Sequence, residues 1–324
     1  MILVTGATGL LGRHLLASLV ADGQPVKALY RNTSKRRIIE SFPEVTWVEC
    51  DILDVIGLED VFSNVKQVYH CAAMVSYDPK LSDKMIHTNV VGTRNVVNAA
   101  LESKVDKMIY VSSIAALGKP PKISVISEDN DHFVPEIATP YAISKFESEK
   151  EVFRGMAEGL NAAVVNPSVI LGEGDYEVGT SAFFSRANKE ARFYTHGATG
   201  FVDVLDVVEA MRLLMDSTVC GERFILSGEN TSYRQIMDWI SEALSKKKAS
   251  QYAPPFLAKI IWRLEAIRAF FTQKSPLITK HTARSAHQIS QYASDKFLKV
   301  FPEFTFTPMV DTIARIAQDF KKEG

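Results

Sequence analysis

The chain has 324 residues and a formal net charge of −1 at pH 7, and 46% of its residues are hydrophobic. This balance excludes a disordered chain and gives no reason to expect nucleic acid or an anionic membrane as a partner. Its three cysteines are an odd number without C-x-x-C spacing, so neither a disulfide framework nor a metal site is expected. No apolar run is long enough to cross a bilayer, and the first predicted strand leaves no room for a signal peptide, so we expect a cytoplasmic protein.

A strand, a glycine-rich turn and a helix are predicted at the start of the chain. Residues 2–4 are apolar and β-prone, and Gly6, Gly9 and Gly12 follow them before an amphipathic stretch. In this context Gly6 permits a tight turn, Gly9 lets backbone N–H groups approach a pyrophosphate, and Gly12 lets the helix pack on the strand. The spacing is GxxGxxG rather than GxGxxG, and a purely structural turn is the alternative to a dinucleotide site.

The residue after the second predicted strand (26–30) bears on cofactor choice. An NAD-selective site places an acidic residue about 20 residues beyond the glycine turn, and here that position holds Arg31. A guanidinium offers donors that suit a 2′-phosphate. We therefore expect NADP rather than NAD, with a solvated basic loop as the alternative role of Arg31.

Further strands are predicted at residues 46–51, 65–73 and 108–111, and a helix opens at Asn89. Their alternation with helical segments predicts an α/β fold with a Rossmann-type, doubly wound parallel sheet. Ala72 and Ala73 end the fourth strand, where small side chains let the backbone lie against a ligand.

A second group of chemically significant residues begins at Thr139, which is expected to cap a helix whose first residue is Pro140. Tyr141 and Lys145 then stand four apart on one face of that helix. An ammonium beside a phenol favours the phenolate and lowers the phenol's pKa, which suits proton exchange with a carbonyl or alcohol.

These features together resemble the extended short-chain dehydrogenase/reductase family, which is epimerase/dehydratase-like. The resemblance is carried by residues 5–12, Asp51-Ile-Leu-Asp54, His70-Cys-Ala-Ala73, Asn89-Val-Val-Gly-Thr93, Ser112-Ser113, Tyr141-x-x-x-Lys145 and three later segments at 166–172, 200–206 and 221–227. It implies that Tyr141 is the general acid/base, that Lys145 holds the nicotinamide ribose and lowers the tyrosine pKa, and that Ser113 binds the substrate oxygen. Ser112 is the alternative serine. The implied dinucleotide site comprises Gly6, Thr8, Gly9, Leu10, Leu11, Gly12, Arg31, Asp51, Ile52, Ala72, Ala73, Tyr141, Lys145, Pro167 and Val169.

The branch of the family is indicated by two motifs of other branches that this sequence lacks. Residues 114–116 lack the acidic pair of sugar-nucleotide dehydratases, and Thr199-Gly200 stands where epimerases usually carry Arg-Asp. The late motifs are more similar to the dihydroflavonol-4-reductase-like branch, whose members reduce ketones or aldehydes with NADPH. The alternatives are a sugar-nucleotide epimerase and a regulator that binds NADP without chemistry.

We expect a dinucleotide-binding domain at 1–167, rejoined by about 200–227, and a mostly helical substrate domain at 168–199 and 228–324. The expected partner is a small-molecule carbonyl or alcohol substrate, and a homodimer is left open. Near the C-terminus, Phe256, Ile260, Leu264, Ile267 and Phe271 form an apolar stripe at helical spacing. A packed helix is expected there, with a lid over an apolar substrate or an interface helix as alternatives.

Overall fold

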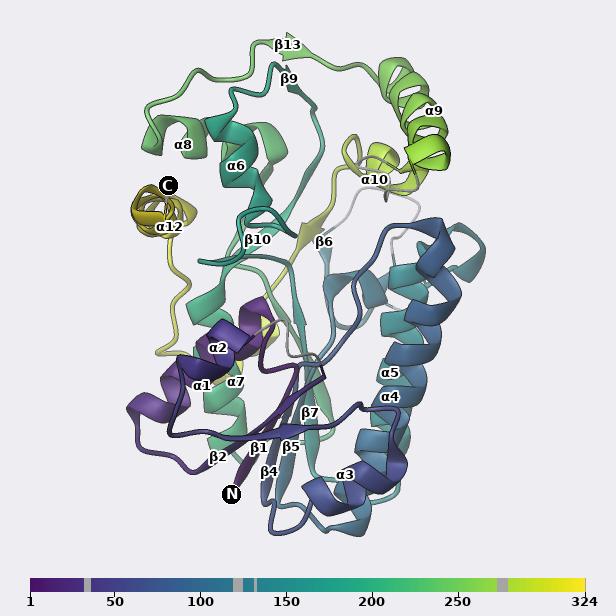
Figure 1. Cartoon of the computed structure of the whole chain (residues 1–324), viewed down its shortest axis with the longest axis vertical. Coiled ribbons are helices and arrows are strands. Elements are labelled where there is room, and N and C mark those ends of the chain that lie inside the picture. The colour runs from purple at the N-terminus through teal and green to yellow at the C-terminus, as the bar shows by residue number, and fades with distance from the viewer. Residues whose placement is uncertain (32–35, 119–124, 131–132, 273–278, 324) are drawn as a thin grey trace.

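The computed structural model describes residues 1–31, 36–118, 125–130, 133–272 and 279–323. Its centre is a seven-stranded parallel sheet in the order β11-β7-β5-β4-β1-β2-β3 (Figure 1). The strands are β1 Ile2–Thr5, β2 Val26–Tyr30, β3 Thr46–Glu49, β4 Gln67–His70, β5 Lys107–Val111, β7 Ala162–Pro167 and β11 Glu222–Leu226. The doubly wound α/β fold predicted from the sequence is confirmed.

Helices cover both faces of this sheet, which is why β5 and β7 are buried along their whole length. One face carries α1 (Leu10–Ala21) and α7 (Val204–Asp216), which pack on each other. The other carries α3 (Val55–Val61), α4 (Ser82–Glu102) and α5 (Pro140–Ala157). A short helix, α2 (Arg36–Glu40), follows β2. Helix α4 begins seven residues before the predicted start at Asn89, and Asp78 caps the 3-10 turn Pro79–Leu81 that leads into it.

The strand order reverses at β1, because β2 and β3 lie on one side of this strand and β4, β5, β7 and β11 lie on the other. This strand pairs with β2 on one side and with β4 on the other, with Thr5 opposite His70. Ligands of open α/β sheets bind at such a reversal, beyond the carboxyl ends of the strands. The glycine turn follows β1 and the Ala72-Ala73 pair follows β4, so the topology brings both to this crevice.

A second layer of structure lies beyond the carboxyl edge of the sheet, in the upper half of Figure 1. Its three-stranded sheet has the order β12-β10-β8, with β8 Val169–Leu171, β10 Ala198–Asp203 and β12 Glu229–Ser232. Helices α6 (Ala182–Asn188), α8 (Tyr233–Ala243) and α12 (Met309–Glu323) share one apolar core with it. Within residues 200–227, β11 pairs with β7 in the first sheet and α7 packs on that sheet, whereas β10 belongs to this second sheet.

The remaining elements are short strand pairs and C-terminal helices. They comprise β6 Val125–Ile126 with β14 Gln291–Tyr292, β9 Phe193–Tyr194 with β13 Gln251–Tyr252, α9 Pro255–Thr272, α10 Lys280–Ser285, α11 Asp295–Val300 and the 3-10 turns Ile114–Leu117 and Pro135–Ile137. None of the helices described is both long and apolar enough to cross a membrane.

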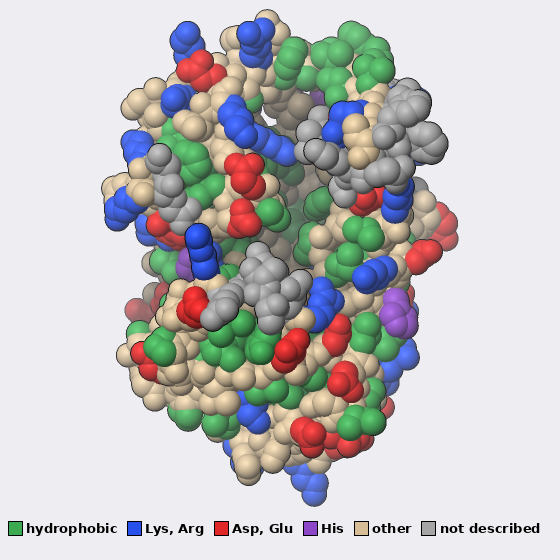
Figure 2. Space-filling view, viewed as in Figure 1, with side chains coloured by type: hydrophobic (Ala, Val, Ile, Leu, Met, Phe, Trp, Pro, Cys, Tyr) green, Lys and Arg blue, Asp and Glu red, His purple; other side chains and the backbone are tan. Residues whose placement is uncertain are grey.

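Helix α9 carries the apolar stripe, and its described side chains are not packed as expected. Phe256, Ile260 and Leu264 are 64%, 50% and 62% exposed, whereas the side chains of Ile267 and Phe271 lie outside the described residues. Figure 2 shows hydrophobic side chains gathered at the upper right, where Figure 1 places this helix. The face seen in Figure 2 is hollowed near its centre, between the two layers.

Candidate active site

The turn after β1 forms a cradle that only glycines allow. Gly6 has a positive φ of 69°, and a Cβ atom on it would lie 2.6 Å from the backbone nitrogen of Ala72. A Cβ atom on Gly12 would lie 2.8 Å from the Cα atom of Ala7, so this glycine is required for helix α1 to pack on the turn. Gly9 caps α1 without a side chain, which leaves the first N–H groups of the helix accessible to an anion. The cradle therefore fits the pyrophosphate of a dinucleotide.

One cavity of about 670 Å³ extends from this cradle to Tyr141. It is lined by most of the residues predicted for the site, namely Gly6, Thr8, Gly9, Leu10, Arg31, Asp51, Ile52, Ala72, Ala73, Ser113, Tyr141, Pro167 and Val169. Leu11 and Gly12 do not line it, because Leu11 packs into the apolar core and Gly12 faces the turn. Lys145 is 3% exposed and lies behind the wall of the cavity.

The wall also includes residues that the sequence did not reveal. They include Arg13, Ile38, Met74, Val75, Tyr77 and, from the loop 172–181, Gly174, Asp175, Val178, Gly179, Thr180 and Ser181. None of them belongs to a motif, and the loop reaches the cradle only through the packing of the second layer, so local patterns carry no signal for it.

At the far end of the cavity, Arg31 faces an acid. Its Nη1 atom lies 3.8 Å from Oδ2 of Asp51, and the two side chains are 59% and 35% exposed. An ion pair this long and this exposed holds the guanidinium only weakly. Arg31 therefore remains accessible to a phosphate at this end.

Tyr141 is the second residue of α5, and the start of that helix is fixed as predicted. The Thr139 hydroxyl accepts a 3.0 Å hydrogen bond from the N–H of Ala142, and Pro140 is the first helical residue. The Ser113 side chain, which follows β5, lies near the phenol, and its Oγ atom accepts the N–H of Ala115 at 3.2 Å. Burial raises the pKa of Tyr141 to about 12, and the nearby Ser113 side chain offsets only part of this rise.

The direction of that shift corrects one expectation. The sequence predicted that Lys145 would lower the pKa of Tyr141. Instead, Nζ of Lys145 donates to the carbonyl of Val111 at 2.8 Å and lies 5.2 Å above the ring of Tyr110. Because the phenol is buried, loss of solvation controls its pKa in this structure.

A buried carboxylate balances the Lys145 charge. Burial lowers the pKa of Lys145 to about 8, and Glu149, one turn further along α5, opposes this lowering. Glu149 is itself 2% exposed and accepts hydrogen bonds from Asn166 and Arg223. The amide of Asn166 also donates to the Ser113 carbonyl at 3.0 Å, so one hydrogen-bonded network connects Glu149, Asn166 and Ser113.

Asn89 holds in place the loop after β4 that contributes Met74 to the cavity wall. Its side chain accepts from the N–H of Met74 at 2.7 Å and donates to the Met74 carbonyl at 3.0 Å. It also donates to the Ser144 hydroxyl, beside Lys145. The loop is thereby attached to the helix that carries Tyr141.

Part of the cavity wall is apolar. Met74, Val75, Tyr77, Ile114 and Val178 contribute to it, and the ring of Tyr77 lies 6.4 Å from that of Tyr141. Val75 and Val178 are 59% and 64% exposed.

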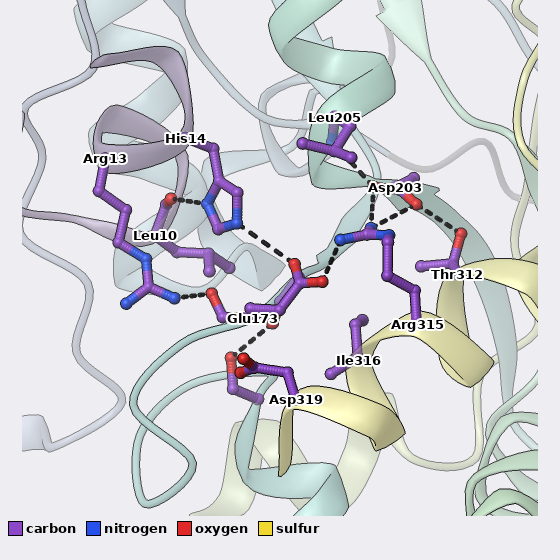
Figure 3. Close-up of polar contacts among 12 residues, drawn as sticks. Leu10, Arg13, His14, Glu173, Asp203, Leu205, Thr312, Arg315, Ile316 and Asp319 are labelled. Atoms are coloured by element: carbon purple, nitrogen blue, oxygen red, sulfur yellow. Dashed lines mark hydrogen bonds and ion pairs between the residues drawn. The ribbon is translucent and has the colours of Figure 1, made fainter. Parts of the chain in front are cut away.

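The loop 172–181, between β8 and α6, is held by a polar cluster (Figure 3). The Glu173 carboxylate accepts from Nε2 of His14 at 3.3 Å and from Arg315 of α12. Burial alone would raise the pKa of Glu173, but these hydrogen bonds lower it to about 2. Arg315 also binds Asp203, at 2.6 and 2.7 Å. Within the residues described, no group of histidine, cysteine or acidic side chains is arranged to hold a metal ion.

Comparison with known proteins agrees with this geometry. The model of the NAD dependent epimerase/dehydratase family matches residues 2–227. The chain is 31% identical to "Sterol demethylase protein B" of Methylococcus capsulatus, over 96% of this chain and 97% of that protein. It is 27% identical to "Cinnamoyl-CoA reductase 1" of Petunia hybrida, over 69% and 72% of the two chains. The crystal structure of gox2253 superposes with a TM-score of 0.85 at 28% identity, covering 100% of this chain and 98% of that one.

Proposed function

Because the chain belongs to the NAD-dependent epimerase/dehydratase family, we propose that it is an NADP-dependent oxidoreductase acting on a carbonyl or alcohol. The observation that carries the proposal is that Ser113 and Tyr141 line the same cavity as the glycine cradle, with the Ser113 side chain near the phenol. This arrangement supports Tyr141 as a proton donor to a substrate oxygen.

Each residue has a defined role in this proposal. When bound, the nicotinamide supplies or accepts the hydride. With a pKa of about 12, the phenol of Tyr141 is protonated near neutral pH and can donate its proton to the oxygen of a carbonyl. Ser113 holds that oxygen beside the phenol. Lys145, held at the Val111 carbonyl, supplies positive charge behind Tyr141 and binds the nicotinamide ribose.

The proposed cofactor residues follow the cavity from end to end. Gly6, Thr8, Gly9 and Leu10, with the backbone of Leu11 and Gly12, hold the pyrophosphate. Asp51 and Ile52 contact the adenine, and Arg31 binds the 2′-phosphate that distinguishes NADP. Ala72, Ala73, Pro167 and Val169 lie along the path toward the nicotinamide.

The proposed substrate has an apolar body. Tyr77 lies beside Tyr141, and Met74 and Val178 line the same cavity. Among the described residues of the wall the cations are Arg13, next to the glycine cradle, and Arg31, beside Asp51, so a nucleoside diphosphate substrate would compete with the cofactor for them. The names of the two relatives mention a sterol and a cinnamoyl group, both of which contain an apolar ring. A sugar-nucleotide epimerase of the same family is the alternative function.

The test is NADPH oxidation, followed at 340 nm, with a panel of steroid ketones, aromatic aldehydes and short aliphatic ketones. UDP-glucose and UDP-galactose are incubated in parallel, and their interconversion is followed by NMR. The proposal predicts NADPH oxidation with ring ketones or aldehydes and no change in the sugars. Interconversion of the sugars without net cofactor turnover would identify an epimerase, and cofactor binding without either reaction would identify a regulator.

A further inference from the structure

Arg13 is a cation on the wall of the cofactor cavity that no motif identifies. It is the fourth residue of α1, its backbone N–H donates to the Gly9 carbonyl, and its partly buried side chain lines the cavity beside Gly9 and Leu10. Its Nη2 atom donates to the backbone carbonyl of Glu173, in the loop between β8 and α6 (Figure 3).

The charge of Arg13 is not neutralised by a protein carboxylate. Glu173 meets Arg13 with its carbonyl, while its carboxylate is occupied by His14 and Arg315. Asp175 also lines the cavity, but its Oδ1 atom accepts the N–H of Glu177. Across the described parts of the chain, Arg13 forms no ion pair with an acidic side chain.

A glycine in the loop allows it to approach the first turn of α1. A Cβ atom on Gly174 would lie 2.7 Å from Oγ of Ser181 and 3.2 Å from Leu10, whereas its distance of 3.4 Å from Nη2 of Arg13 is an ordinary contact. The glycine thus lets the loop fold against α1 with the Glu173 carbonyl at Arg13. The result is a fixed, unpaired cation beside a cradle of backbone N–H groups.

We infer that Arg13 binds the pyrophosphate of the dinucleotide and that the Glu173 carbonyl positions it for this contact. The inference rests on the proposed cofactor site and adds a side-chain contact to its backbone cradle. A guanidinium that keeps one N–H on a carbonyl has four more to offer a diphosphate. Arg31 lies on another part of the wall, at the end of β2 beside Asp51, so the two arginines serve different phosphates.

The test is isothermal titration of Arg13→Gln with NADPH and with NADH, in the absence of substrate. Because both cofactors contain the pyrophosphate, the dissociation constant should rise about tenfold or more for both. Arg212→Gln is the matched control, since Arg212 contacts α1 through Ser18 and Asp22 away from the cradle. It should leave both affinities within about twofold. Arg13→Lys keeps the positive charge but removes the planar guanidinium and its paired donors, so it should give an intermediate loss of cofactor affinity.

Unchanged affinities in Arg13→Gln would overturn the inference, and so would a loss confined to NADPH, which would place Arg13 on the 2′-phosphate. An equal loss in Arg212→Gln would also overturn it, by showing that α1 itself is disturbed. If Arg13→Gln does not fold, the same comparison is made with Arg13→Lys. The measurement needs no turnover, so its outcome is separate from whether the protein reduces a carbonyl.

Discussion

The Nζ atom of Lys145 donates a 2.8 Å hydrogen bond to the carbonyl of Val111, the last residue of β5. This bond joins helix α5 to the strand that leads into Ser112 and Ser113. The bond therefore helps to hold Tyr141, on α5, at a fixed place relative to Ser113, which follows β5.

Tyr141→Phe keeps the packing of the ring and removes only the hydroxyl. We expect cofactor affinity to be retained and turnover to fall about a hundred- to ten-thousandfold, because a positioned acid contributes that much to rate. Cofactor titration measures the affinity, and steady-state rates with any accepted carbonyl substrate measure the turnover. Tyr77→Phe, on the facing aromatic, is the control and should keep most of its turnover. Near wild-type turnover in Tyr141→Phe would remove the phenol from the mechanism.

Lys145→Met should lose turnover and weaken cofactor binding, yet raise thermal stability at pH 7. Burial lowers the pKa of Lys145 from 10.5 to about 8, so the unfolded chain holds this proton more tightly than the folded protein. The charged lysine therefore costs stability in full below pH 8, and the cost declines as the pH rises toward 10.5.

The melting temperature of Lys145→Met should accordingly exceed that of the wild type at pH 7 by more than it does at pH 10. Lys150→Met is the matched control, because that lysine lies on the same helix with its ammonium exposed beside Glu147. It should show no such pH dependence. A lower melting temperature for Lys145→Met at pH 7 would contradict the assignment of a buried cation that is kept for function.

Ser113→Ala should slow hydride transfer and leave NADPH affinity nearly unchanged, since the hydroxyl contacts the phenol rather than the cradle. Ser112→Ala should do less, because the Ser112 side chain is buried near the Glu149 carboxylate. Single-turnover measurements of NADPH oxidation compare the two variants. A larger loss in Ser112→Ala would place the substrate oxygen one residue away from the position proposed.

Arg31→Ala should lose affinity for NADPH and leave affinity for NADH nearly unchanged. One charge-assisted hydrogen bond contributes about 1.5–3 kcal/mol, which corresponds to about ten- to a hundredfold in the dissociation constant. The Asp51 carboxylate 3.8 Å away is too exposed to cancel this charge. Titration of both cofactors into wild type and variant is the measurement, and equal wild-type affinities for NADPH and NADH would refute the NADP preference.

Much of the fold could be predicted because its signals are local. The strand and glycine turn at the start of the chain, the Thr139 cap and the alternation of strands and helices depend on neighbours within a few residues. The four-residue spacing of Tyr141 and Lys145 likewise fixed their shared helix, but not the pKa of the phenol, which is determined by burial.

What the sequence did not reveal depends on contacts between distant segments. Glu173 and Arg13 are in contact although they are 160 residues apart in the sequence. Arg223 of β11 contacts Glu149, from which it is 74 residues apart. Neither pairing follows from propensity or periodicity. The apolar stripe of α9 was expected to pack, yet its described side chains are exposed. Amphipathic spacing indicates an apolar face but does not specify which neighbour covers it.

The attachment of loop 172–181 to α12 has a consequence for dynamics. Besides the contact between Glu173 and Arg315, the hydroxyl of Tyr176 donates to Asp319 at 2.7 Å, so the loop beside the cradle and the C-terminal helix share their restraints. A cofactor that orders the loop should slow amide hydrogen exchange in α12, although this helix contributes no residue to the cavity wall described above. By linkage, loosening α12 through Arg315→Met should lower cofactor affinity by the same free energy that the cofactor contributes to holding the helix in place.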